Sequence, residues 1–144
     1  MHRRFFLRQS CMACAGMLAV PGLLASCSGL QPIVGTLEGE DLVLPAGAFT
    51  KEDGSMRRHV VATHAQLKQP IAVFRDGGGG YSSVLMRCTH KGAELRVGGD
   101  RLDCSVHGST FDSHGGVLEG PASSPLRAFP TLERDGRVFI SLRA

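Results

Sequence analysis

The stretch CTHKGAELRVGGDRLDCSVHG, residues 88–108, determines what this chain can bind. It begins with Cys88 and His90, which are separated by one residue, and it ends with Cys104 and His107, which are separated by two. The 13 residues between His90 and Cys104 are enough for a strand, a turn and a second strand. A hairpin here would bring two thiols and two imidazoles to the same end of a sheet.

Strand-like segments surround this stretch on both sides. Apolar and β-branched residues predict strands in 41–49 and 59–65, and paired runs predict hairpins in 70–88, 93–106 and 129–142. The turns of these hairpins are expected at Gly77–Gly80, Gly98–Asp100 and Asp135–Gly136. No helical periodicity of useful length follows residue 30. We therefore expect an all-β fold, a small antiparallel sandwich or partly open barrel.

Composition and charge argue against two classes of function, nucleic-acid binding and nucleotide binding through a phosphate loop. The chain has 144 residues, enough for one domain, and its 19 glycines suit short strands joined by tight turns. Of the 16 basic residues, Arg3, Arg4 and Arg8 lie at the N-terminus, and the other 13 equal the 13 acidic residues in number. No basic patch indicates nucleic acid as a partner. No Lys-Ser/Thr pair follows Gly77–Gly80, so this run is not a phosphate loop.

The first 27 residues predict an export signal. Arg3 and Arg4 precede an apolar run, and the sequence RRFFLR resembles the twin-arginine signal. The sequence LASC, ending at Cys27, resembles the lipobox of bacterial lipoproteins, in which the cysteine carries a lipid. The alternative is an ordinary signal-peptidase site near Ala25 that leaves Cys27 as a free thiol. Pro21 and the short length of the run argue against a transmembrane span.

These motifs predict the organisation and location of the chain. We expect an export signal in 1–27, a tether in 28–36 and one domain in 37–144. The protein is expected to be exported across the inner membrane and to be periplasmic. A lipid on Cys27 would hold the domain on the membrane surface.

Cysteine counting leaves two thiols for the folded domain. Of the five cysteines, Cys11 and Cys14 fall in the signal and Cys27 in the lipobox. A disulfide between Cys88 and Cys104 would leave the two matched histidines unexplained.

Two metal sites remain as alternatives. A single zinc ion can accept two Cys and two His, but one residue between ligands is an unusual spacing for it. A [2Fe–2S] cluster with two thiolates on one iron and two imidazoles on the other explains why each piece carries one of each. The isolated His59, His64 and His114 are not expected to bind metal.

At this point the sequence resembles the Rieske family. The resemblance spans about residues 70–142 and is carried by Cys88-Thr89-His90 with Gly92, by Cys104-Ser105-Val106-His107-Gly108-Ser109, and by Phe111-Asp112, Gly115-Gly116 and Gly120-Pro121-Ala122. It implies antiparallel sheets with two ligand loops and a proline loop in a cluster-binding part of about 86–125. It further implies that Cys88 and Cys104 bind the inner iron, while His90 and His107 bind the outer iron.

The resemblance also assigns roles to neighbouring residues. Gly92 and Gly108 would let backbone amides approach the sulfurs, and Ser109 either donates a hydrogen bond to a bridging sulfide or serves as a turn hydroxyl. Phe111 stands where high-potential members have a tyrosine. Lys91 would raise the potential or help to dock an acidic partner, or else it is simply solvated.

The family's inter-loop disulfide is expected to be absent. Ala93 and either Ser105 or Val106 stand where cytochrome bc members have two further cysteines. Together with Phe111, this predicts a reduction potential below the top of the family range of about −150 to +300 mV.

The resemblance implies a one-electron carrier with no catalytic residue of its own. Its partners would be a cytochrome or a membrane or periplasmic oxidoreductase, and the membrane surface itself through the lipid. A Rieske oxygenase needs a second domain with mononuclear iron, for which this length leaves no room. One alternative is a small subunit of a larger oxidoreductase or quinol-oxidising complex. The other is a zinc- or disulfide-stabilised surface lipoprotein that acts as a binding module.

Overall fold

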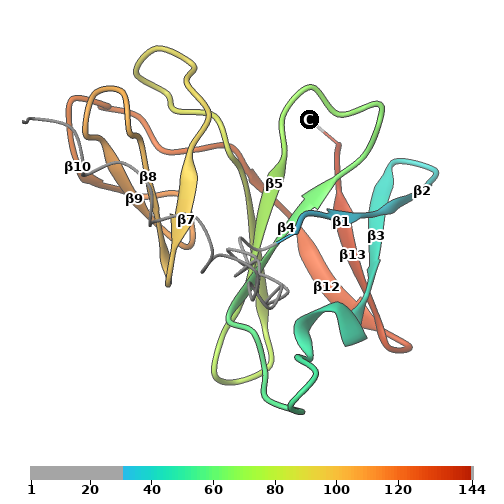
Figure 1. Ribbon diagram of the computed structural model, residues 1–144. Helices are drawn as coiled ribbons and strands as arrows, with labels where there is room; N and C mark the ends of the chain where they lie inside the picture. The colour runs from blue at the N-terminus through green and yellow to red at the C-terminus, as the bar shows by residue number, and fades with distance from the viewer. Residues whose placement is uncertain (1–30, 144) are drawn as a thin grey trace, which may run out of the picture.

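The structure, a computed structural model, describes residues 31–143, and the predicted signal with Arg3, Arg4 and Cys27 lies outside these residues. Within this range the chain forms three sheets and one 3₁₀ turn, so the all-β prediction is confirmed (Figure 1). Their bounds are β1 Ile33–Val34, β2 Thr36–Glu38, β3 Asp41–Pro45, η1 Ala46–Phe49, β4 His59–Thr63, β5 Ile71–Arg75, β6 Tyr81–Leu85, β7 Arg96–Gly98, β8 Arg101–Asp103, β9 Thr110–Asp112, β10 Val117–Glu119, β11 Ala128–Phe129, β12 Thr131–Arg134 and β13 Arg137–Ser141. The described part contains no helix that is long and apolar enough to span a membrane.

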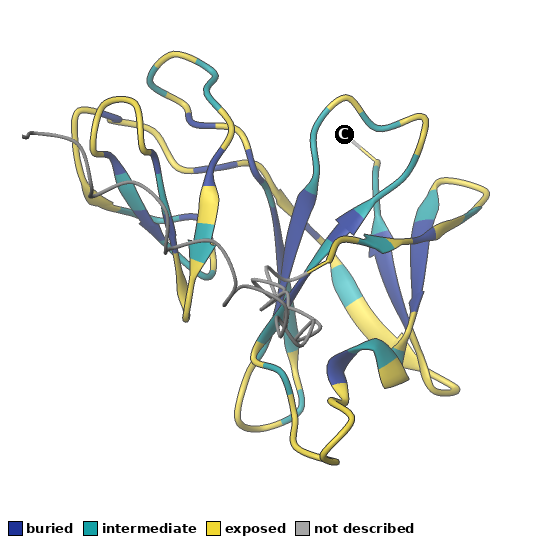
Figure 2. Ribbon diagram, in the orientation of Figure 1, coloured by how far each residue is buried: buried dark blue, intermediate teal, exposed yellow. Residues whose placement is uncertain are grey.

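The middle sheet is covered on both faces. Its strand order is β1-β4-β5-β6-β11, and all pairs except β1–β4 are antiparallel. The four residues Ile71–Phe74 of β5 are all buried, as the uninterrupted apolar sequence IAVF suggests for a strand with protein on both sides (Figure 2). Successive side chains on a strand point to opposite faces, so β5 contributes to two separate cores.

The first core, which we call the sandwich core, lies between the middle sheet and the sheet β12-β13-β3-β2. Strands β3 and β13 pair over their full five-residue lengths. The buried members of the sandwich core are Leu42, Leu44, Phe49, Val60, Ala62, Ile71, Val73, Phe129, Val138 and Ile140.

The second core, which we call the cluster-side core, lies on the opposite face of the middle sheet. It packs against the small sheet β10-β9-β8-β7, in which every strand has three residues. Its buried members are Ala72, Phe74, Val84, Met86, Cys88, Leu95, Leu102, Cys104, Phe111, Ala122 and Leu126. Both cysteines of the opening stretch thus belong to a hydrophobic core.

All three predicted hairpins are present. Strands β5 and β6 pair around the Gly77–Gly80 turn, β7 and β8 around Gly99-Asp100, and β12 and β13 around Asp135-Gly136. Asp135 and Gly136 both have positive φ, 53° and 69°, as a two-residue turn between twisted strands requires.

Three local features differ from the sequence-based expectations. The strand expected over 41–49 ends at Pro45, and 46–49 form the 3₁₀ turn η1. Residues 33–36, expected in the tether, include β1, and Gly35 donates a backbone hydrogen bond to the Thr63 carbonyl at 2.9 Å. The hairpin of β9 and β10 was not expected, because strands of three residues are too short to show alternation.

Candidate functional site

The two Cys–His pieces fold into loops with the same backbone hydrogen bonds. In residues 88–93, the Cys88 N–H donates to the Ala93 carbonyl, and the Gly92 N–H donates to the Cys88 carbonyl, both at 2.8 Å. In residues 104–109, the equivalent bonds run from Cys104 to Ser109 at 2.8 Å and from Gly108 to Cys104 at 2.9 Å. The loops therefore correspond residue by residue, although their histidines stand at different places.

Each ligand loop depends on a glycine at its fifth position. Gly92 and Gly108 have φ values of 76° and 82°, a region that other L-residues enter only at a cost. Glycine is therefore favoured at both positions by the backbone conformation of the loop. Gly92 also lies under Arg87, because a Cβ added there would be 3.1 Å from Nε of that guanidinium.

The two cysteines lie side by side beneath the loops as free thiols. Cys88 and Cys104 are 1% and 2% exposed. Burial raises the pKa of Cys104, but hydrogen bonds from the backbone N–H groups of His107 and Val106 and from the Cys88 thiol outweigh it, and the net pKa is lowered. Backbone amides aimed at the sulfur favour the thiolate, which is the form that binds metal.

The two histidines meet above the thiols. The rings of His90 and His107 are in edge contact with centroids 4.7 Å apart, and His107 is exposed while His90 is half-buried. Burial, and then the charges of His107 and Lys91, lower the pKa of His90 and favour the neutral ring. Its Nδ1 is shielded from solvent and has no hydrogen-bond partner, so a lone pair is free for a metal. The donor set fits a cluster with thiolates inside and imidazoles outside.

A third loop, residues 120–126, is attached to both ligand loops. The Thr89 hydroxyl donates to the Ser124 carbonyl at 2.6 Å, and the Ala122 N–H donates to Ser109 Oγ at 3.0 Å. Ser109 is fully buried, so its hydroxyl is more than an exposed turn hydroxyl. The Gly120–Pro121 peptide bond is cis. The sequence indicated a proline loop over the site, but nothing in it indicated the bond between Thr89 and Ser124.

The other residues singled out in the sequence lie elsewhere or in the packing. Phe111 is fully buried in the cluster-side core, opposite Leu102 in the strand register. His64 and His114 take part in turn hydrogen bonds, and His59 packs against Phe74. In residues 31–143, no three His, Cys, Asp or Glu side chains are grouped as ligands of a single metal ion.

Comparison with known proteins explains this arrangement. Residues 48–130, more than half of the chain, match the model of the Rieske [2Fe–2S] domain. The chain belongs to the Rieske family. Its cofactor is a Rieske [2Fe–2S] cluster, and the domain is an electron-transfer carrier.

Related proteins include oxygenase components and cytochrome b6-f iron-sulfur subunits. The oxygenase subunit of tert-butanol monooxygenase / tert-amyl alcohol desaturase from Aquincola tertiaricarbonis is 35% identical over 51% of this chain but only 18% of its own length. The cytochrome b6-f complex iron-sulfur subunit 2 of a Nostoc species is 26% identical over 83% of this chain and 53% of its own. The chain thus spans about half or less of these relatives.

A solved structure is similar over most of its own length. The plasma membrane Rieske protein PetC3 of Synechocystis has a TM-score of 0.52 and 26% identity, covering 58% of this chain and 86% of that one.

Proposed function

We propose that Cys88 and Cys104 bind one iron of the cluster and that His90 and His107 bind the other. The observation that carries this proposal is the pair of matching loops, which place two buried thiols beneath two touching imidazoles. The cluster supplies a one-electron couple when bound. The chain excludes water at the thiols, donates backbone hydrogen bonds to sulfur and leaves His107 exposed as a point of electron exchange.

The absence of a bridge between the loops and the absence of a hydroxyl on Phe111 support a potential below the top of the family range. No bridge joins the loops, since both cysteines of the described range are free and Ala93 stands at the place of a further cysteine. Phe111 has no hydroxyl to offer to a sulfur. Ser109 accepts a hydrogen bond from Ala122, and its own proton remains available for a bridging sulfide, a bond that would act in the opposite direction by stabilising the reduced cluster.

We also propose that the protein works outside the inner membrane. The support is sequence alone: Arg3 and Arg4 in a twin-arginine-like signal and Cys27 in a lipobox-like site. The twin-arginine route carries folded proteins, which suits a cofactor inserted before export. The carrier would exchange electrons with a cytochrome or an oxidoreductase at the membrane surface.

The ligand assignment is tested by electron paramagnetic resonance of the full-length protein after reduction with dithionite. We expect a rhombic signal with the low average g value of histidine-ligated clusters, and its loss in Cys88→Ser and His107→Ala. His114→Ala is the matched control, because this exposed histidine lies outside both loops. A rhombic signal that survives His107→Ala, or a colourless zinc-containing protein, would refute the assignment.

Export and lipidation need separate variants. Replacing Arg3 and Arg4 with Lys should leave the protein in the cytoplasm, whereas Cys27→Ala should release it from the membrane into the periplasmic fraction. A protein that stays membrane-bound in Cys27→Ala would refute the lipid anchor.

The match to a cytochrome b6-f iron-sulfur subunit over 83% of the chain favours one second candidate, a small subunit of a larger complex. Isolation of the native protein in mild detergent decides between the two. A free carrier elutes alone, and a subunit elutes with its complex.

A further inference from the structure

The correspondence between the ligand loops defines a small surface at the cluster end of the molecule. Cys88 matches Cys104 and Gly92 matches Gly108, so His90 corresponds to Val106 in the third place of each loop. In the fourth place, Lys91 corresponds to His107.

We call His90, Lys91, Val106 and His107 the tip quartet. Val106 is 61% exposed and Lys91 and His107 are also exposed, while the two imidazoles touch each other. The quartet thus combines two imidazoles with one exposed aliphatic side chain and one ammonium group. An exposed apolar side chain beside the site of electron exchange is suited to a dry contact with another protein.

Lys91, the one charged residue within the ligand loops, and Arg87, which precedes them, are positive, while Glu94, Asp103 and Glu119 flank the loops and residues 120–126. Lys91 and Arg87 are exposed, and neither takes part in any of the four ion pairs found within residues 31–143. The two ligand loops and residues 120–126 contain no acidic residue. The nearest acidic side chain along the first loop is Glu94, whose backbone pairs with Arg87 but which forms no ion pair with it.

Arg87 also lies beside the first ligand loop. Its guanidinium lies against the backbone of Gly92, where an added Cβ would be 3.2 Å from Nη2. Outside the signal the chain has equal numbers of basic and acidic residues, so the positive charges of Lys91 and Arg87 are a local feature and not part of a net positive domain.

We propose that the tip quartet with Arg87 is the docking surface for a redox protein that has an acidic rim around an apolar centre. This deepens the proposed function and rests on it. Val106 meets the apolar centre, Lys91 and Arg87 face the carboxylates, and the imidazoles are brought toward the partner's redox group. Anionic lipid could meet the same charges, but a lipid headgroup surface offers no electron acceptor to the histidines. The partner is therefore a protein.

The test uses two c-type cytochromes of opposite surface charge as probes of the holoprotein. The dithionite-reduced protein is mixed with each oxidised cytochrome, and the second-order rate of electron transfer is measured as salt is raised. The native protein should react with the acidic cytochrome at a rate that falls with ionic strength. Lys91→Glu should slow this reaction by about three- to tenfold at low salt and should accelerate the reaction with the basic cytochrome.

The matched control is Lys51→Glu, which makes the same charge change. Lys51 is exposed and lies in the segment after η1, at the end of the molecule opposite the ligand loops (Figure 1). Lys51→Glu should leave both rates within about twofold of the native values. The reduction potential of each variant is titrated, so that a change in driving force is separated from a change in docking. Arg87→Glu is the second variant, and Lys91→Glu stands alone if Arg87→Glu fails to fold.

A binding measurement completes the test without electron transfer. An acidic cytochrome whose iron is replaced by zinc should bind the native protein several-fold more tightly than it binds Lys91→Glu. The rhombic resonance signal is recorded for every variant first. With the cluster shown to be present, equal effects of Lys91→Glu and Lys51→Glu overturn the docking surface and leave the electron carrier intact. Lys91-dependent binding to phosphatidylglycerol vesicles, with no preference for the acidic cytochrome, likewise overturns it.

Discussion

The sandwich core and the cluster-side core pack against opposite faces of one sheet, yet they are built differently. On the sandwich side, β3 and β13 are five residues long and pair over their whole length. On the cluster side, no strand of the small sheet exceeds three residues. The buried members of the first core are all apolar, whereas the second core includes the two thiols that we propose as iron ligands. The difference suggests that one half of the molecule folds by itself and the other depends on its cofactor.

Removing a cluster ligand should have the largest effect and should affect one side only. In Cys104→Ser, we expect loss of the cluster and a rise of at least about tenfold in amide hydrogen exchange over β7–β10, because metal binding contributes directly to the stability of the fold around it. Exchange in β3 and β13 should stay at the native rate. The measurement is hydrogen exchange with mass spectrometry, and Ser105→Ala, next to the ligand and exposed, is the control. A uniform rise over both sheets would mean that the two cores unfold together.

The same contrast explains which strands and turns could be predicted from the sequence. Five-residue strands with long apolar runs and Asp-Gly or Gly-Gly turns are visible in the sequence, and the hairpins at 70–88 and 129–142 were predicted with their turns. The small sheet was predicted only in part, since β9 and β10 are too short to give a pattern.

For the site, the paired spacing predicted that the two thiols and the two imidazoles meet at one end of a sheet, and the structure places the two rings in edge contact and the Cys88 thiol in hydrogen-bond contact with Cys104. The contact between Thr89 and the Ser124 carbonyl joins residues 35 apart in a loop without periodicity. Local sequence does not encode such a contact. The same holds for the placement of Arg87 over Gly92.

Alanine substitutions of two turn glycines compare a turn on the cluster side with a turn on the sandwich side. Gly115, between β9 and β10, has φ +91°, and an added Cβ would lie 3.1 Å from Leu126 Cβ and 3.2 Å from Val84 Cγ1. Gly136, in the β12–β13 turn, has φ +69° and open space around it. Both Ala variants carry the left-handed penalty of about 1–2 kcal/mol. The free energy of unfolding should fall by about 1–3 kcal/mol more in Gly115→Ala than in Gly136→Ala, because the methyl group at position 115 also overpacks a buried contact. Urea unfolding measures both, and equal losses would show that the β9–β10 turn relaxes around a methyl group.

The pH dependence of stability should involve His59, at the start of β4. Its ring packs against Phe74 with centroids 5.9 Å apart, and neither ring nitrogen forms a hydrogen bond. Burial lowers the pKa of His59 below 6.5, and the nearby Gly99 backbone offsets this only in part. A lowered pKa means that the folded state prefers the neutral ring. The contribution is therefore complete above pH 6.5 and is lost as the pH falls through the interval between 6.5 and the folded pKa.

Urea midpoints measured from about pH 8 to about pH 5 test this expectation. The native midpoint should fall on acidification, and His59→Asn should flatten the decline. His114→Asn should leave the decline unchanged, because His114 is exposed. A decline unchanged by His59→Asn would assign the acid sensitivity to other groups.

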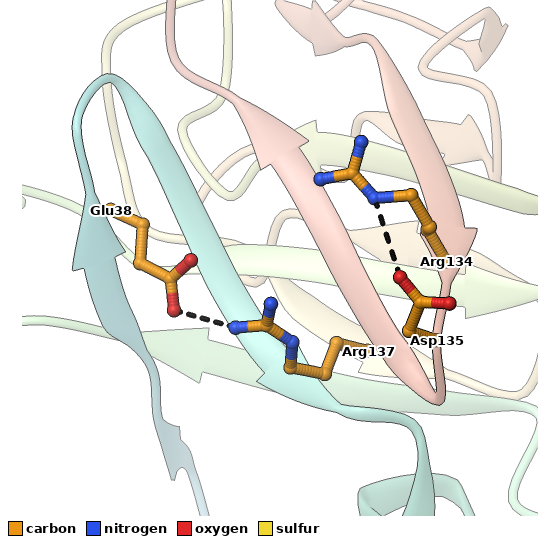
Figure 3. A network of polar contacts seen from close by, with 4 residues as sticks. All are labelled: Glu38, Arg134, Asp135 and Arg137. Atoms are coloured by element: carbon orange, nitrogen blue, oxygen red, sulfur yellow. Dashed lines mark hydrogen bonds and ion pairs between the residues drawn. The ribbon is translucent and has the colours of Figure 1, made fainter.

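The smallest effect is expected at the outer surface of the sandwich side. Figure 3 shows Glu38 of β2 reaching across to Arg137 of β13, with Oε1 and Nη1 2.7 Å apart. The side chains are 45% and 47% exposed, so water and salt screen the pair, and Glu38→Gln should cost only about 0.2–1 kcal/mol, a loss that disappears in high salt. Arg137→Ala should cost more, because the guanidinium also lies 4.9 Å from the Phe139 ring centroid and covers it. Urea unfolding at low and high salt separates the two contributions. If Glu38→Gln cost as much as Arg137→Ala, the ion pair and not the packing of the guanidinium on Phe139 would account for the contribution of Arg137 to this outer face.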